Sequence, residues 1–212
     1  MKQPAFSVTR LGALCLSAAL LSAGLSACAP LVVGGAMGTG VLVATDRRTS
    51  GAQLEDQGIE LKAASRLGDQ FGDRARVIVT SFNRRVLLTG DVPSAADKAA
   101  AERTVAAVEN VKVIVNELGI QSSPSLTARS ADALVTARVK AAMIDAKDLQ
   151  ANTVKVVTER GTTYLMGVVT QREADRATEI TRSISGVQRV VRVFEVISDA
   201  ELQKLQPEPA KK

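Results

Sequence analysis

Alternating apolar and polar positions occur in two similar stretches of the chain. Residues 76–92 and residues 153–169 each contain two runs rich in β-branched and other apolar residues, separated by a short polar turn. Alternation of this kind, broken by turn residues, predicts a β-hairpin in each stretch. When the two stretches are aligned, Gly90 falls opposite Gly167 and Val92 opposite Val169. The chain therefore contains an internal repeat.

A helical spacing precedes each hairpin. Apolar residues fall four positions apart, which places them on one face of a helix. The positions match between the two copies: Ile59, Ala63 and Leu67 in the first, and Val135, Val139 and Met143 in the second. These six residues are the predicted core face of the first helix in each repeat.

A second helix and a third strand are predicted after each hairpin. Residues 94–108, with Ser94 as N-cap, and residues 171–184 have helical patterns. Residues 110–115 and 186–191 are short apolar runs that follow them. A strand reached through a helix should lie parallel to the strand before that helix. The expected fold class is therefore α+β, with two tandem αββαβ domains, each a three-stranded mixed sheet packed on two helices.

The first 28 residues have the pattern of a lipoprotein export signal. A basic head with no acidic residue precedes an apolar run, residues 11–25, that is short for a transmembrane helix. The run ends in Leu25-Ser26-Ala27-Cys28, which looks like a bacterial lipobox. We expect residues 1–27 to be removed and Cys28 to carry acyl chains; the alternative is an ordinary signal peptide with a chance cysteine. The residue after Cys28 is alanine rather than aspartate, which favours the outer membrane.

The remaining boundaries follow from the repeats. Residues 28–46 contain a glycine-rich stretch that we interpret as a flexible tether, because no helix of a βαβ unit follows it, as a dinucleotide site would require. The first domain is predicted at residues 47–118, a linker at 119–127 and the second domain at 128–197. The polar residues 198–212 are predicted to be a disordered tail.

Composition excludes several functional classes. The chain has no histidine, so Ser-His and Cys-His nucleophiles and histidine metal sites are impossible. It has no Trp and one Tyr, and without residues 1–27 its net charge is +3, which is too mild to suggest nucleic-acid binding. The pair Ser94 and Lys98 has a capping explanation, and carboxylates at turns and helix starts are expected to be solvated or to face a helix dipole. Those carboxylates are Asp145 and Asp148, and Glu173 and Asp175. We expect no catalytic residues, no metal and no cofactor.

The repeated unit resembles a known family of domains. The doubled αββαβ unit, with "LLTGDV" in the first copy and "YLMGVVTQREADRA" followed by "ISGVQRVV" in the second, is similar to a pair of BON domains. Together with the lipobox, residues 25–197 resemble the dual-BON outer-membrane lipoproteins. This resemblance implies binding to phospholipid and a role in envelope integrity and cell division. It also implies that the first helix of the second domain docks on lipid, with an aromatic residue in the family where this chain has Leu134.

The charge distribution and the helical periodicity also favour the first helix of the second repeat as the docking element. The first repeat is balanced in charge, and the basic excess lies in the second repeat. Leu134 lies about 100° around the helix from the core residue Val135, and its counterpart in the first repeat is Gly58. The candidate phospholipid-binding residues are Leu134, Arg138, Ala141, Arg129 and Lys140. The alternative is that Leu134 edges the core or packs against the other repeat.

The predicted function is that of a lipoprotein anchored through Cys28 on the periplasmic face of the outer membrane. Its predicted partner is an anionic phospholipid membrane, bound through the second domain, and nucleic acid is not expected. Two alternatives stay open: a scaffold for outer-membrane assembly or division proteins, which could add a strand to an exposed sheet edge, and a structural spacer in the envelope.

Overall fold

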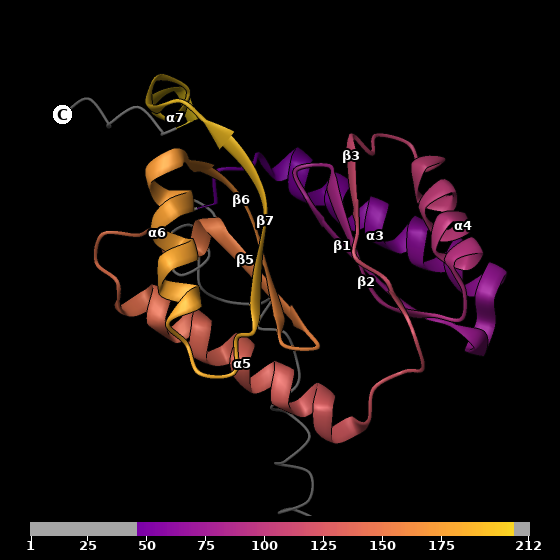
Figure 1. Ribbon diagram of the computed structural model, residues 1–212. Helices are drawn as coiled ribbons and strands as arrows, with labels where there is room; N and C mark the ends of the chain where they lie inside the picture. The colour runs from indigo at the N-terminus through magenta and orange to yellow at the C-terminus, as the bar shows by residue number, and fades with distance from the viewer. Residues whose placement is uncertain (1–45, 206–212) are drawn as a thin grey trace, which may run out of the picture. The chain divides into compact units, whose positions relative to one another are not determined.

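Each repeat begins with a long helix that the hairpin then packs against. The computed structural model describes residues 46–205 (Figure 1). In the first repeat, Thr49 is the N-cap of the helix and accepts a hydrogen bond from the Ala52 amide, and Gly72 ends it with φ 51°. The elements of the first repeat are α3 (Ser50–Phe71), η2 (Gly72–Arg74), β1 (Arg76–Phe82), β2 (Arg85–Val92), α4 (Ala95–Ala106), β3 (Val113–Asn116) and β4 (Gly119–Ile120).

The second repeat has the same αββαβ order of its main elements. Its strands form one sheet in the order β5-β6-β7, with β5 and β6 antiparallel and β6 and β7 parallel. In the first repeat β2 likewise pairs antiparallel with β1 and parallel with β3, as the αββαβ prediction requires. The second repeat comprises α5 (Leu126–Asp145), η3 (Ala151–Thr153), β5 (Val154–Glu159), β6 (Thr162–Thr170), α6 (Gln171–Arg182) and β7 (Arg189–Ile197), and α7 (Asp199–Leu205) follows it.

Both hairpins turn through two residues with positive φ. These are Asn83 and Arg84 in the first repeat and Arg160 and Gly161 in the second. Two positive φ values in succession are typical of the type I′ turn, whose twist matches that of the flanking strands. The turn therefore sets the register in which Val79 lies opposite Leu88 in the first sheet and Val156 opposite Leu165 in the second.

One face of each sheet is covered by the two helices of its own repeat. In the first repeat, Ile59, Ala63 and Leu67 of α3 pack with Val86 and Leu88 of β2. In the second, Val135, Val139 and Met143 of α5 pack with Leu165 and Val169 of β6. All six predicted core positions are buried. The prediction of the core face is confirmed.

The opposite faces of the two sheets cover each other. A third buried cluster draws Phe82 and Leu87 from the first repeat and Tyr164, Met166, Val168 and Val193 from the second. Successive strand residues point to opposite faces. β2 therefore sends Val86 and Leu88 to its own helices and Leu87 to the other repeat. The two repeats share an apolar interface and belong to one compact unit.

Ion pairs and hydrogen bonds surround this interface. Each joins a residue of the first repeat to a residue of the second, and most involve an arginine. They include Arg76 with Glu159, Arg160 with Asp91 (2.6 Å), Arg189 with Glu117 (2.6 Å), Lys155 with Glu60 (3.1 Å) and Asn83 with Glu195 (2.7 Å).

Three local predictions need correction. The third strands begin later than expected, at Val113 and Arg189, because Asn110 and Gly186 have positive φ and belong to the turns that follow α4 and α6. The predicted linker at 119–127 contains β4, which pairs with the end of β2, so the first sheet has four strands rather than three. The linker's last two residues already belong to α5, whose N-cap is Ser125.

The predicted disordered tail is wrong for residues 199–205. These residues form α7 because the side chains of Ser198 and Glu201 cap the helix start reciprocally. The Glu201 amide donates to Ser198 Oγ (3.2 Å), and the Ser198 amide donates to Glu201 Oε2 (2.8 Å). This is the capping-box pattern of a serine followed three residues later by a glutamate. The signal segment, Cys28, the tether up to residue 45 and the last seven residues of the tail lie outside the described residues.

Candidate functional site

The candidate lipid-docking residues all lie exposed on α5. Ser125 is the N-cap of this helix and accepts a hydrogen bond from the Ala128 amide. The helix buries Val135, Val139 and Met143 against the second sheet, and Leu134 is 59% exposed. Leu134 therefore neither edges the core nor packs against the first repeat. Arg129, Arg138, Lys140 and Ala141 are exposed as well.

The exposed face of α5 carries a longer apolar stripe than the sequence analysis identified. Leu126 and Ile144, which are 73% and 68% exposed, lie on the same side of the helix as Leu134 and Ala141. At 100° per residue these four side chains fall within an arc of about 80°. The sequence could have revealed this stripe, because its apolar residues have a second helical periodicity on the side of the helix opposite the core face. We call Leu126, Leu134, Ala137, Ala141 and Ile144 the outer stripe of α5.

Three cations flank the outer stripe. Arg138 lies on one side of it, and Arg129 and Lys140 lie on the other. Among residues 46–205, none of the three has a carboxylate within ion-pair distance. Lys62, the counterpart of Arg138 in the first repeat, instead pairs with Glu109 at 3.0 Å. The cations on α5 are therefore available to an external anion.

The first repeat also exposes leucines on its first helix. Leu54 is 71% exposed and Leu61 is 74% exposed, one turn on either side of Gly58. Although Gly58 stands in α3 where α5 has Leu134, the exposed faces of both helices therefore carry apolar side chains. The neighbouring cations of α3 are already engaged, since Lys62 pairs with Glu109 and Arg66 donates to the carbonyl of Ala107. The difference between the two helices lies in unpaired charge.

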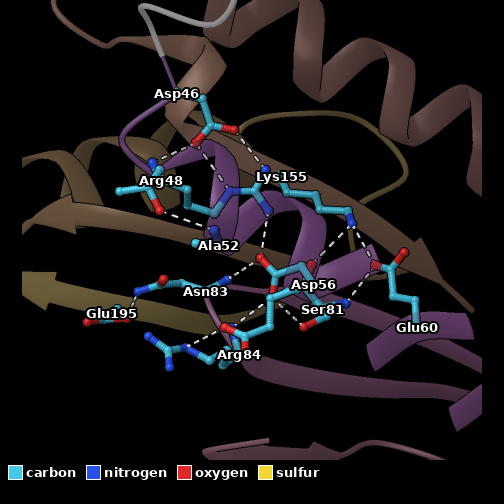
Figure 2. A network of polar contacts seen from close by, with 12 residues as sticks. Asp46, Arg48, Ala52, Asp56, Glu60, Ser81, Asn83, Arg84, Lys155 and Glu195 are labelled. Atoms are coloured by element: carbon cyan, nitrogen blue, oxygen red, sulfur yellow. Dashed lines mark hydrogen bonds and ion pairs between the residues drawn. The ribbon is translucent and has the colours of Figure 1, made fainter. Parts of the chain in front are cut away.

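A buried aspartate on the first helix of each repeat holds the hairpin turn. Asp56 accepts hydrogen bonds from the amides of Asn83 (2.7 Å) and Arg84 (2.8 Å) and from Ser81 Oγ (2.7 Å). Figure 2 shows these donors converging on Asp56, with Arg48 reaching it from the other side. Burial opposes the charge on Asp56, but the hydrogen bonds outweigh it and lower its pKa.

The second repeat has the same arrangement. Asp132 of α5 accepts from the amides of Arg160 (2.7 Å) and Gly161 (2.9 Å). The equivalence of Asp56 and Asp132 is visible once the repeats are aligned, but the sequence analysis did not single it out. These carboxylates position the hairpins and are structural.

The residues just before α3 connect both repeats. Arg47 donates two hydrogen bonds of 2.7 Å to the Glu173 carboxylate of the second repeat and one of 2.9 Å to the carbonyl of Val168. Arg48 pairs with Asp56 of the first repeat (2.8 Å) and with Asp46 (2.7 Å), and its guanidinium lies 3.8 Å from the centre of the Phe82 ring. We call residues 46–49 the strap.

Glu173 meets one of its two expected roles. It lies in the first turn of α6, where a carboxylate faces the helix dipole, and it is not solvated, since its side chain is 5% exposed. It also accepts from the Thr170 amide as part of a capping box at the start of α6. Burial disfavours its charge, yet the hydrogen bonds from Arg47 and Thr170 dominate and lower its pKa to about 2.

A cleft opens beside the C-terminal half of α5. Its volume is about 370 Å³. The strap and β1 line one side with Asp46, Arg48 and Phe82, and the second repeat lines the other with Lys140, Met143, Ile144, Ala151, Asn152, Val154 and Lys155. The cleft therefore brings the beginning of the described chain next to the end of the outer stripe.

Comparison with known proteins settles the family. The family model described as BON domain matches residues 55–122 and 131–198, which together cover most of both repeats. The chain belongs to the BON domain family. Its two BON domains are the two αββαβ units of the structure.

Three relatives extend this result. The chain is 37% identical over 175 residues to Outer membrane lipoprotein DolP of Haemophilus influenzae, covering 82% of this chain and 90% of the relative. It is 30% identical over 154 residues to the 21 kDa hemolysin of Actinobacillus pleuropneumoniae, covering 72% and 79% of the two chains. Osmotically-inducible protein Y of Escherichia coli is 27% identical over 141 residues, covering 65% of this chain and 70% of its own.

These relationships confirm the outer-membrane location that the sequence predicts for this BON-domain lipoprotein. Acylation of Cys28 and the roles of the α5 residues stay predictions. In the part of the chain that the structure describes, no helix is both long and apolar enough to cross a bilayer.

Proposed function

We propose that the protein binds anionic phospholipid through the outer stripe of α5 and supports envelope integrity from the periplasmic face of the outer membrane. The observation that carries this proposal is the exposed apolar stripe with three unpaired cations beside it. An apolar helix face flanked by Lys and Arg is the arrangement of helices that lie in a membrane interface. In this proposal Cys28 supplies the acyl anchor.

The expected binding energy between α5 and the membrane is moderate. A Lys or Arg near an anionic membrane surface contributes about 1 kcal/mol, and a large aliphatic side chain that becomes fully buried contributes about 1.5–3 kcal/mol. Leu126, Leu134 and Ile144 enter the interface only in part, and α5 lacks the Trp or Tyr that prefer it. The helix would therefore orient a protein that the acyl chains already hold at the membrane.

The same proposal assigns no catalysis to the protein. The chain contains no histidine, and the buried carboxylates Asp56, Asp132 and Glu173 are fully engaged in holding turns, a helix cap and the strap. Each has a structural donor set that leaves it no role as an acid or base. Binding, not chemistry, is the function that the residues support.

Flotation with lipid vesicles tests the proposal. The chain from Ala29 to Lys212, which lacks the acylated residue, should float with vesicles containing phosphatidylglycerol and not with vesicles of phosphatidylcholine alone. Arg138→Glu reverses one charge and should weaken binding roughly 30-fold, at about 1 kcal/mol for each unit of charge. The effect should shrink as salt is added, because screening acts over about 8 Å at physiological ionic strength.

The matched control is Lys62→Glu, at the equivalent position of the first BON domain. Lys62 is exposed and already paired with Glu109, so its replacement should leave flotation unchanged. Equal binding by wild type and Arg138→Glu would contradict the proposal. A scaffold for outer-membrane assembly or division proteins would then be the better explanation, and a pull-down from solubilised membranes would identify the partner.

A further inference from the structure

β7 is the longest edge strand in the described part of the chain. It spans nine residues, and among residues 46–205 no strand pairs with it on the side away from β6. The other edge strands are shorter: β1 has seven residues, β3 four, β4 two and β5 six. An edge strand presents a row of backbone N–H and C=O groups that have no partner in the sheet. β7 therefore offers a continuous backbone surface to another extended chain.

Common protections of an edge strand are missing from β7. Lysine, proline and bulges hinder the pairing of an edge with another chain. β7 contains neither lysine nor proline, and its register with β6 is unbroken from Arg189 to Ile197. On β1, by contrast, the Ser81 amide donates to Glu60 (2.7 Å), and Lys155 donates to the Ser81 carbonyl (3.4 Å). The edge of β1 is thus partly occupied, whereas the described chain leaves the edge of β7 unpaired.

A groove lies beside β7, between this strand and α6. The helix packs against the strand (Figure 1), and the groove has a volume of about 570 Å³. Only charged side chains line it: Arg172, Asp175, Arg176, Glu179 and Arg182 of α6, and Arg192 of β7. The side chains of a strand point alternately to the two faces of its sheet. Every second side chain of a strand added to β7 would therefore point toward α6 and its arginines.

Two of the arginines in this groove have no carboxylate partner among the described residues. Arg172 donates to the carbonyl of Asp148 (3.3 Å), which leaves its charge uncompensated, and Arg182 is exposed. The ion pairs already present are Arg176 with Asp148 and Glu179, and Arg192 with Asp175. An additional carboxylate could therefore bind Arg172 or Arg182 without displacing an existing pair.

The first repeat builds the same fold without this arrangement. Its N-cap Ser94 aligns with Thr170, which sets α4 against α6. The two unpaired arginines then correspond to alanines: Arg172 to Ala96, and Arg182 to Ala106. β3 ends after four residues at Asn116, whose side chain donates to the carbonyl of Lys98 in α4 (3.0 Å). The long edge and the arginines beside it are therefore features of the second domain that the fold does not require.

We infer that β7 and the arginines of α6 bind an extended acidic segment of a partner protein, which adds to the three-stranded second sheet as a further strand. The backbone of the segment pairs with β7, and its carboxylates reach Arg172 and Arg182. A second copy of this chain fits less well, because it would bring its own arginines against the groove. A lipid surface also fits less well, since no apolar side chain lines the groove. The site is separate from α5, which packs against β5 at the other edge of the sheet.

Titration with a synthetic peptide tests this inference. The probe has the nine-residue length of β7, alternating threonine and glutamate, and blocked ends. It is added to the isotope-labelled chain from Ala29 onward. One control peptide has lysine in place of glutamate, and another has N-methyl groups on its backbone amides, which remove the donors for strand pairing but keep the charge. The glutamate peptide should shift the amide resonances of β7 and α6, and neither control peptide should do so.

Charge reversal in the groove tests the assignment of the arginines. The double variant Arg172→Glu/Arg182→Glu should bind the glutamate peptide roughly tenfold more weakly, because two attractive pairs at exposed positions become repulsive. The matched control, Ala96→Glu/Ala106→Glu on α4, should bind the peptide like wild type. Arg138→Glu should keep peptide binding, and the double variant on α6 should keep flotation with lipid vesicles, since the two sites are separate.

The outcomes distinguish this inference from the proposed function. Equal binding of the N-methylated peptide would overturn strand addition, and equal binding of the lysine peptide would overturn the selection for carboxylates. Shifts of the β7 amides that depend on protein concentration alone would assign the edge to a second copy of the chain. An absence of binding by the glutamate peptide would overturn the inference and leave lipid docking by α5 intact. Because the control peptides are used with the wild-type protein, their result stands even if the double variant does not fold.

Discussion

At the scale of single residues, buried carboxylates organise this protein. Asp56 and Asp132 each hold a hairpin turn by its amides, and Glu173 holds both the start of α6 and the strap. A buried charge is tolerated only when charged partners and hydrogen bonds replace water. Each of these groups therefore fixes two segments of the chain at once.

Glu173 makes the stability of the protein dependent on pH in acid. Its pKa falls from an ordinary value of 4.5 to about 2 in the folded protein. The stabilisation is fully present above about pH 4.5 and is lost as the pH falls toward 2, with a total of about 3 kcal/mol. We predict that urea unfolding of wild type loses stability over this interval and that Glu173→Gln loses correspondingly less.

Glu179→Gln on the exposed face of α6 is the control, because its carboxylate makes only a surface pair with Arg176. Parallel stability curves for wild type and Glu173→Gln between pH 4.5 and 2 would show that the pair of Arg47 and Glu173 does not carry this dependence.

The sequence alone could place Leu134 but not Glu173. Whether a helical residue lies on or off the core face depends on its immediate neighbours, and the spacing of Val135, Val139 and Met143 defines that face. The environment of Glu173 depends on Arg47, which is 126 residues away in the chain. No local pattern indicates that contact.

At the scale of elements, local patterns predict the helices and hairpins and miss their ends. Periodicity marks α3, α5 and the strands, but the strand starts after α4 and α6 depend on positive φ at Asn110 and Gly186. The helix α7 could have been predicted, since Ser198 and Glu201 have the spacing of a capping box. The polar composition of the tail concealed it.

Gly90 and Gly167, which helped to reveal the repeat, are required where each hairpin's strands come close together. A Cβ at Gly90 would lie 1.9 Å from the Arg76 carbonyl oxygen, and the residue has φ 115°. A Cβ at Gly167 would lie 2.4 Å from the carbonyl oxygen of Thr153. The backbone itself is the obstacle, so a side chain cannot be accommodated by a change of rotamer.

We predict that Gly90→Ala lowers the free energy of unfolding by roughly 2–4 kcal/mol, through strain at a special backbone conformation. Gly58→Ala is the matched control. It lies within α3 with nothing within 4 Å of its Cβ, so it should raise stability by up to about 1 kcal/mol through helix propensity. Urea denaturation of both variants checks the opposite signs. A stable Gly90→Ala protein would contradict the strand geometry.

At the scale of the whole molecule, the packing of the two sheets is the feature that sequence reasoning did not reach. The predicted domains were two-layer sandwiches, each with one sheet face unaccounted for. In the structure those faces bury Leu87 and Met166 against each other. The nearly continuous burial along β2 and β6 is typical of strands covered on both faces. This burial pattern could have indicated that the two sheets share an interface, but it could not have indicated which sheet faces meet.

This packing leaves the first helix of each domain facing outward. α3 and α5 each cover the outer side of a sheet, and each exposes leucines. We propose that α5 docks on lipid and α3 does not, because α5 combines an apolar stripe with unpaired cations whereas the cations of α3 are engaged. Equally exposed leucines on the two helices provide a direct comparison.

The most direct measurement is flotation of Leu134→Asp and Leu61→Asp, in the chain from Ala29 onward, with vesicles containing phosphatidylglycerol. Both positions are exposed, so both variants should stay folded, which circular dichroism checks. We predict that Leu134→Asp loses binding, since it removes an apolar side chain and places a carboxylate beside Arg138, and that Leu61→Asp binds like wild type. Wild-type binding by Leu134→Asp, or loss of binding by Leu61→Asp, would contradict the assignment of lipid docking to α5.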